Sequence, residues 1–281
     1  MKRPDKINNI VVISDTHCGC QFGLCPSEIT KDGGGTYHSS PLQKKVWKAW
    51  DEWWNKYVPI YTKEEPYILV FNGDMIDGVH HNAVTQIDHN LATQSNIAEK
   101  IMRPILENKK CVEYYHIRGT EAHVGQSAQE EERLARLLNA VPDENGNHSR
   151  WELWMRLDKA LIHFCHTIGA TGSSSYESTA VYKEMVEAFN EAGRWHDEPP
   201  DVCCRSHRHR QFEVTIATDK GMGKSIVTPG WQLKTGFTYR LASARASTPQ
   251  VGGYLIRTGD VDEVYTRFHV WKLGRSKEVI L

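Results

Sequence analysis

The sequence lacks the features that mark membrane proteins and general polyanion binders. No apolar run approaches the ~18 residues that a membrane span needs. The 281 residues carry a formal net charge of only -1, with 34 Lys+Arg against 35 Asp+Glu. No overall positive charge is therefore present to hold nucleic acid non-specifically, so any polyanion must be bound locally. No internal repeat is visible, and no linker is long enough to separate two domains.

Cysteine is too sparse, and odd in number, for a disulfide framework. There are seven cysteines, several of them in apolar runs, which is typical of reduced thiols. The start, "MKRPDKINNIVVISD", has no signal-peptide core because its apolar stretch ends after four residues. We therefore expect a cytoplasmic protein with no membrane partner. Cys18, Cys20 and Cys25 could form part of a zinc knuckle, but no second ligand pair follows at finger spacing, so we interpret them as free thiols.

Apolar patterning changes along the chain from alternating strands and helices to hairpins. Buried strands are predicted at "NNIVVISDTH", "PYILVFNGD" and "CVEYYHIRGT". One helix is predicted to begin at Ser40 as its N-cap and Pro41 as its first residue. A second is predicted over 89–106, and a third is predicted to follow a capping box of Ser127 and Glu130. Four tryptophans on the first helix are interpreted as core packing rather than base stacking.

The second half contains hairpins around 151–166, 211–230 and 252–273, and a helix over 176–192 that ends at Gly193. This order predicts an α/β fold of two packed mixed β-sheets flanked by helices. We expect one domain over residues 1–281, with an insertion at 18–65.

Carboxylates and imidazoles follow five predicted strands, each at the point where the strand ends. Taken singly, each is more often a turn, a cap or a satisfied core residue. Together they form a series, and the carboxyl ends of strands in α/β sheets are where sites form. A mixed carboxylate and imidazole set is what borderline divalent cations require. The series reads Asp15-x-His17, Gly73-Asp74, Gly119-x-x-x-His123, His166 and His207-x-His209.

In this order the motifs resemble those of the calcineurin-like metallophosphoesterase superfamily, from Val11 to roughly Gly230 and including "TPGW". The resemblance implies two metal ions bridged by Asp74. His166 is preferred to His163 because it lies at the strand end, and an offset of three points the two to opposite faces. His163 is interpreted as a core residue. The ligands implied are Asp15, His17 and His209 for the first metal, and His166 and His207 for the second.

The chain departs from the family pattern after the third strand. Relatives read Gly-Asn-His-Asp/Glu there, with the Asn as a metal ligand and the His as general acid, whereas this chain reads "RGTEAHVG". We expect Glu121 to replace the Asn on the second metal, with Thr120 or His123 as alternatives. His123 is the predicted general acid, since imidazole donates protons near neutral pH.

The resemblance implies a dinuclear phosphoesterase that works by metal-activated hydroxide attack. Manganese is the expected metal, with iron, zinc or nickel as alternatives, and a phosphodiester of nucleic acid or nucleotide is the expected substrate. A phosphomonoesterase or protein phosphatase, and a non-catalytic scaffold, are the rival interpretations. His80, His81 and Arg208 are predicted to bind substrate, although the two histidines could be exposed loop residues. Of the three arginines in "CCRSHRHRQF", we expect one or two to be merely solvated.

Overall fold

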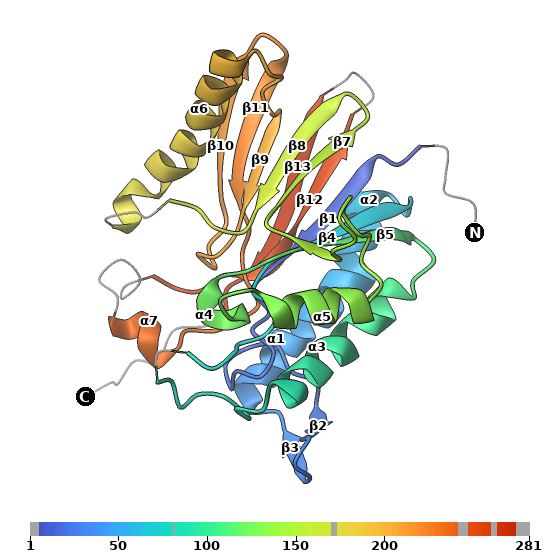
Figure 1. Ribbon diagram of the computed structural model, residues 1–281, viewed down its shortest axis with the longest axis vertical. Helices are drawn as coiled ribbons and strands as arrows, with labels where there is room; N and C mark the ends of the chain where they lie inside the picture. The colour runs from blue at the N-terminus through green and yellow to red at the C-terminus, as the bar shows by residue number, and fades with distance from the viewer. Residues whose placement is uncertain (1–5, 81, 170–172, 241–246, 260–262, 274–281) are drawn as a thin grey trace.

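Two mixed β-sheets pack face to face at the centre of the molecule, drawn in Figure 1 from a computed structural model. The structure describes residues 6–80, 82–169, 173–240, 247–259 and 263–273. The larger sheet has the strand order β13-β12-β1-β4-β5-β6, and the smaller one has the order β10-β11-β9-β8-β7. The strands of the larger sheet are β1 (Asn9–Ile13), β4 (Tyr67–Asn72), β5 (Cys111–Ile117), β6 (Ser149–Arg150), β12 (Val251–Thr258) and β13 (Val264–Trp271). Those of the smaller sheet are β7 (Glu152–Leu157), β8 (Ala160–Cys165), β9 (Val202–Arg205), β10 (Phe212–Thr218) and β11 (Gly221–Val227).

The central strand β1 is buried on both faces, which explains why its sequence is an unbroken apolar run. Val11 and Ile13 face the helices that cover the larger sheet. Ile10 and Val12 face the smaller sheet and pack in a second core. This alternation follows from the period of two along a strand. The strand therefore joins the two hydrophobic cores.

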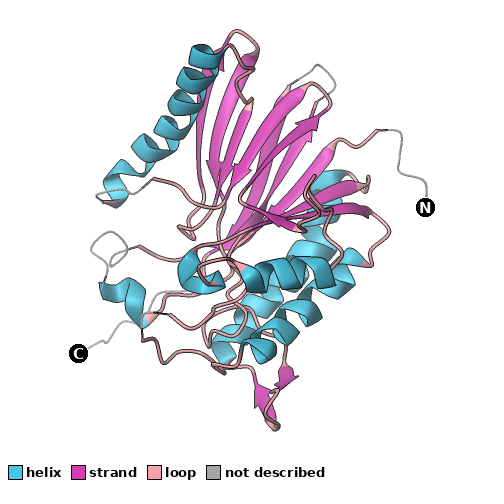
Figure 2. Ribbon diagram, viewed as in Figure 1, coloured by secondary structure: helices cyan, strands magenta, loops and turns pink. Residues whose placement is uncertain are grey.

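Helices cover the outer faces of both sheets (Figure 2). Helices α1, α3 and α5 lie against the larger sheet, and α6 packs on β9, β10 and β11 of the smaller one. A short hairpin, β2 (Glu28–Thr30) with β3 (Thr36–His38), extends from the helical side. The helices are α1 (Pro41–Glu52), η1 (Trp53–Tyr57), α2 (Val58–Thr62), α3 (Leu91–Leu106), α4 (Glu121–Val124), α5 (Gln129–Leu137), η2 (Ser174–Tyr176), α6 (Glu177–Trp195) and α7 (Gly236–Arg240).

The first helix begins as the sequence predicts. Ser40 accepts a hydrogen bond from the Gln43 amide, and the Gln43 side chain accepts one from the Ser40 amide, which is a complete capping box. Trp50 and Trp53 are buried, and the Trp50 ring lies edge-on to Trp231 at 4.8 Å. The interpretation of this aromatic stripe as core packing is confirmed.

Two predicted helix ends are wrong. Helix α5 begins at Gln129 after Ala128 in a left-handed conformation, and Ser127 makes no capping bond to the backbone. The Ser127 hydroxyl donates instead to the Gln129 side chain, and Ala128 occupies the position before the helix. Helix α6 continues through Gly193 to Trp195 and ends at the left-handed His196, whose amide, like that of Asp197, donates to the Ala192 carbonyl.

The predicted fold class, two packed mixed sheets flanked by helices, is confirmed. Residues 18–65, which contain β2, β3, α1, η1 and α2, connect the parallel neighbours β1 and β4. The interpretation of this segment as an insertion in one domain stays a prediction. Within the described residues, no helix is both long and apolar enough to cross a membrane.

Candidate metal centre

Strand ends from both sheets meet at one edge and place the predicted polar residues together. Strands β1, β4 and β5 run parallel in the larger sheet, and β8 and β9 run parallel in the smaller one. Backbone hydrogen bonds join the loops that follow them: the Asp15 amide donates to the Gly73 carbonyl at 2.9 Å, and the Ser206 amide to the His166 carbonyl at 2.9 Å. The site is therefore built on the rigid ends of the two sheets.

Several of these loop residues adopt a backbone conformation that is uncommon for residues other than glycine. Among the described residues, twelve non-glycine residues have positive φ, and five of them are predicted metal ligands. Such strain persists where the surrounding structure imposes it, and it is concentrated at functional sites. The five are Asp15 (φ 54°), His17 (φ 41°), Asp74 (φ 57°), His207 (φ 71°) and His209 (φ 52°).

Four three-residue groups among the described residues have the spacing of metal ligands, and Asp15, His17 and His209 form the first of them. Asp15 Oδ1 lies 3.2 Å from His209 Nε2 and 3.9 Å from His17 Nε2. The two Nε2 atoms of His17 and His209 are 3.1 Å apart. Each residue thus turns a ligand atom toward the same point.

Asp74, His166 and His207 form the second group. Asp74 Oδ2 lies 3.0 Å from His166 Nε2 and 3.9 Å from His207 Nδ1. The His166 ring is fixed because its Nδ1 donates to the Asn72 carbonyl at 2.6 Å, which leaves Nε2 facing Asp74. Gly73, with φ of 88°, must be glycine because a Cβ there would collide with the His166 ring.

The two groups adjoin each other. Asp15 Oδ1 is buried, has no hydrogen-bond partner in the described part of the chain, and lies 3.9 Å from His166 of the second group. A buried carboxylate oxygen with three imidazole nitrogens around it is a donor set that suits divalent transition metals. The residues present therefore fit two cations.

Electrostatics keep the two carboxylates ionised and ready to bind a cation. Burial alone would raise the pKa of Asp15, but the adjacent His209 imidazole lowers it to about 2. Burial would likewise raise the pKa of Asp74, but His166 lowers it well below its usual value. Burial would lower the pKa of His166, but Asp74 raises it to about 10. A cation that binds here therefore competes with a proton on His166.

Glu121 is not brought to the site, which corrects the expectation that it replaces the missing Asn. Its side chain is exposed in the first turn of α4, and it belongs to none of the candidate groups among the described residues. Thr120 precedes the helix and faces inward instead: its amide donates to Asp74 Oδ1 at 2.8 Å, and its hydroxyl lies 3.1 Å from the same oxygen. The helix start turns Glu121 away.

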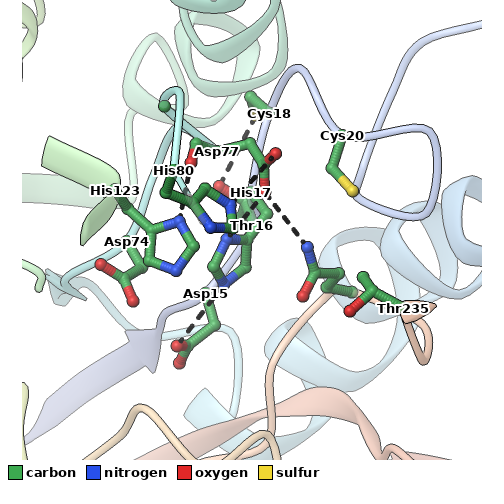
Figure 3. Close-up of polar contacts among 12 residues, drawn as sticks. Asp15, Thr16, His17, Cys18, Cys20, Asp74, Asp77, His80, His123 and Thr235 are labelled. Atoms are coloured by element: carbon green, nitrogen blue, oxygen red, sulfur yellow. Dashed lines mark hydrogen bonds and ion pairs between the residues drawn. The ribbon is translucent and has the colours of Figure 1, made fainter. Parts of the chain in front are cut away.

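His123 lies inside the cluster rather than at its margin. Its ring is edge-on to His17 and to His80, with ring centroids 4.4 Å apart in both pairs (Figure 3). Its Nδ1 donates to the Asp77 carbonyl at 2.7 Å. His123 also forms a candidate ligand group with His17 and Asp74. Burial lowers the pKa of His123 to about 4. The histidine two positions later than in the family motif therefore reaches the site.

The predicted substrate-binding residues have different surroundings. His80 is half-buried, 3.6 Å from Asp77 Oδ2, so the interpretation of it as an exposed loop histidine is wrong. His81 lies outside the described residues. Arg208 donates to the Gly169 carbonyl, and its substrate role stays a prediction.

Two other expectations for this region are corrected. The neighbouring arginines are ion-paired rather than solvated: Arg205 with Glu184 at 2.8 Å and Arg210 with Glu177 at 2.6 Å. These pairs hold the loop against α6, whose acidic residues the sequence analysis did not consider. His163 is not a core residue, because it lies on the outer face of β8, stacked on Trp154.

Asp77, three residues after Asp74, is interpreted from the sequence as a turn residue or a supporting contact, and the structure shows the supporting contact. Its Oδ1 lies 3.4 Å from His17 Nδ1 and accepts from Gln232 at 3.3 Å, while Oδ2 accepts from Gln86 at 2.9 Å. Figure 3 shows this carboxylate beside His17 and His80. Its position three residues after Asp74 was the available signal. Asp77 fixes the ring orientation of a candidate metal ligand.

Asp77→Asn is expected to weaken metal binding and hydrolysis by about ten- to a hundredfold, because the amide no longer holds His17 by charge. The affinity for Mn²⁺, measured by calorimetric titration, checks this result. The matched control is Asp88→Asn on the same loop, whose carboxylate accepts from the Asn90 amide and the Thr93 hydroxyl. Equal affinities in the two variants would contradict the role of Asp77.

Comparisons with known proteins give structural likenesses only. No protein-family model matches this chain, and no curated protein matches it. Among solved structures, the chain is similar to a novel archaeal phosphodiesterase, with 12% identity, 94% of this chain and 99% of that chain covered, and a TM-score of 0.40. It is similar to a metallophosphoesterase from Sphaerobacter thermophilus, with 10% identity, coverage of 94% and 88%, and a TM-score of 0.39.

A third similar structure is Vps29 complexed with zinc from Entamoeba histolytica, with 10% identity, coverage of 93% and 98%, and a TM-score of 0.38. Identities and TM-scores this low add nothing to the case for an activity, which rests on the residues of the site.

Proposed function

We propose that this chain is a dinuclear metal-dependent phosphoesterase of the calcineurin-like type, and that it hydrolyses phosphodiesters. The observation that carries the proposal is the pair of adjoining ligand groups, Asp15–His17–His209 and Asp74–His166–His207. They come from four strand ends of two sheets, and both carboxylates are buried. Clusters of this kind are seldom without function.

In this proposal, Asp15, His17 and His209 would hold one cation, and Asp74, His166 and His207 would hold another, with Asp74 serving both. Two divalent cations, manganese first among them, would supply the Lewis-acid chemistry that polarises a phosphoryl oxygen and lowers the pKa of a water molecule. The protein contributes orientation. Thr120 fixes both oxygens of Asp74, at 3.1 and 3.2 Å from its hydroxyl. The Asn72 carbonyl fixes the tautomer of His166. His80 and Arg208 are the groups proposed to contact the substrate phosphate.

The test is the hydrolysis of bis-p-nitrophenyl phosphate against p-nitrophenyl phosphate by the protein loaded with Mn²⁺. We expect the diester to have the larger kcat/KM. A larger value for the monoester would support a phosphomonoesterase or protein phosphatase. Binding of two metal ions with neither substrate hydrolysed would support a non-catalytic scaffold.

His123 is proposed to protonate the leaving oxygen once the anionic substrate raises its pKa from about 4, and a substrate comparison tests that role. His123→Ala is expected to keep both metal ions, and to lose more than about tenfold in kcat on an alkyl-ester diester than on a nitrophenyl diester. Nitrophenolate is a stable anion and leaves without being protonated, whereas an alkoxide has to be protonated in order to leave. Metal content and the two kcat values are the measurements. Loss of one metal ion, with both substrates slowed alike, would make His123 a ligand instead.

A further inference from the structure

A fully buried carboxyl group, that of Glu131 on α5, lies behind the metal centre without contacting any candidate ligand side chain. Its Oε1 accepts a hydrogen bond from the Met75 amide at 3.0 Å, and its Oε2 accepts one from the Gly119 amide at 2.5 Å. Carboxyl groups are rarely buried unless they are paired or hydrogen-bonded. One side chain thus joins the loop after β4 to the loop after β5.

These two amides adjoin the residues that matter most at the second metal group. Met75 directly follows Asp74, and Gly119 directly precedes Thr120, which donates to Asp74 through its amide. A Cβ on Gly119 would collide with Asp74, so the two loops are already in close contact. Asp74, Thr120 and Glu131 therefore belong to one closed ring of hydrogen bonds and backbone.

The carboxyl group is itself held from behind. His116 Nε2 lies 3.7 Å from Glu131 Oε1, and the Tyr114 hydroxyl lies 2.6 Å from His116 Nδ1. All three side chains are buried. Because β5 provides Tyr114 and His116, the position of Glu131 is fixed by the sheet as well as by its helix.

We propose that Glu131 is a positioning residue that sets the place of the Asp74 carboxylate by holding the Met75 and Gly119 amides. The inference rests on the proposed function, because it assigns Glu131 to the carboxylate shared by the two cations. Without both bonds, two buried amides lose their partner and the loops are free to separate. The carboxylate of Asp74 then no longer lies at a fixed distance from His166.

Glu132, the next residue of α5, provides a matched control. Its carboxylate also accepts backbone amides, those of His148 at 3.0 Å and Ser149 at 2.8 Å, but these belong to the start of β6 and not to the metal loops. Glu131→Gln and Glu132→Gln thus each replace a carboxylate that accepts two backbone amides, although Glu132 is also ion-paired with Arg118 and Arg136. In each variant, the side-chain NH₂ group of the glutamine faces a backbone N–H and cannot accept a hydrogen bond from it.

The experiment compares both variants with the wild type by hydrogen exchange, Mn²⁺ titration and hydrolysis of bis-p-nitrophenyl phosphate. For Glu131→Gln we expect faster exchange at the amides of Met75 and Gly119, about tenfold weaker Mn²⁺ binding, and a kcat about tenfold lower with KM within about twofold. For Glu132→Gln we expect faster exchange at His148 and Ser149, with kcat and metal affinity within about twofold of wild type.

Equal losses of kcat in the two variants, or unchanged exchange at Met75 and Gly119 in Glu131→Gln, would overturn the proposal. Should the glutamine variant not fold, Glu131→Asp keeps a carboxyl group but shortens the side chain by one methylene, which withdraws it from the two amides, and the same readouts apply. A wild type that hydrolyses neither ester contradicts the proposed function alone, because exchange and metal affinity still decide the role of Glu131.

Discussion

Asp74→Ala is expected to lower kcat on a phosphodiester by at least about a thousandfold, equivalent to about 4 kcal/mol of transition-state stabilisation. Asp74 belongs to the group with His166 and His207 and also to the group with His17 and His123. In the proposed function it is the carboxylate that both cations share. Its removal would leave the second cation with two imidazoles and would separate it from the first.

The measurement is kcat on bis-p-nitrophenyl phosphate together with the melting temperature, which separates chemistry from folding. The control is Asp74→Asn, which keeps an acceptor for Thr120 but not the charge. It should retain the fold and lose nearly as much activity. Activity within about tenfold of wild type in both variants would mean that Asp74 is not the shared carboxylate.

Removal of metal with a chelator is the second prediction with a large effect. We expect hydrolysis to fall by at least about a hundredfold, and Mn²⁺ to restore it, because no protein group of the cluster can polarise a phosphoryl oxygen as a divalent cation does. Asp15 and Asp74 are both ionised and would repel an anionic phosphate unless cations are present. The rate before chelation, after it, and after titration with Mn²⁺ checks the prediction.

A control with Mg²⁺, a hard cation, sharpens this result. Mg²⁺ prefers oxygen ligands, whereas the groups around Asp15 and Asp74 are rich in imidazole, so Mg²⁺ should restore less activity than Mn²⁺. Full activity in the chelated protein, measured with metal-free buffers, would contradict a metal mechanism.

The sequence was most informative where a short buried strand ends in a polar residue. Asp15 and Asp74 follow such strands in the larger sheet, and because parallel strands end at a common edge, their meeting could be predicted without a structure, whereas His166 follows β8 of the smaller sheet. The same reasoning places His207 and His209 after β9. The two-sheet fold was predictable for a related reason, since β1 is apolar on both faces.

The sequence was least informative where a side chain's direction depends on distant packing. Glu121 was expected at the metal because carboxylates are good ligands, but a helix begins at this residue and turns it outward. Glu131 is the middle one of three consecutive acidic residues, 130–132, and the sequence gives no sign that it alone of the three is fully buried. Periodicity cannot separate Glu131 from Glu132, because the backbone amides that they accept come from other loops.

Ion pairing of the arginines shows the same limit. Arg205 and Arg210 flank the predicted ligands His207 and His209, and a basic stretch beside a metal motif suggests phosphate contacts. Their partners, Glu184 and Glu177, are on α6, more than twenty residues earlier in the chain. Only the packing of α6 on the smaller sheet brings these charges together.

The measurement that tests the central claim most directly is anomalous diffraction from crystals of the protein grown with Mn²⁺. The account predicts two anomalous peaks per chain, one enclosed by Asp15, His17 and His209, and one by Asp74, His166 and His207. A crystal with a single peak, or with peaks only outside these two groups, would contradict it.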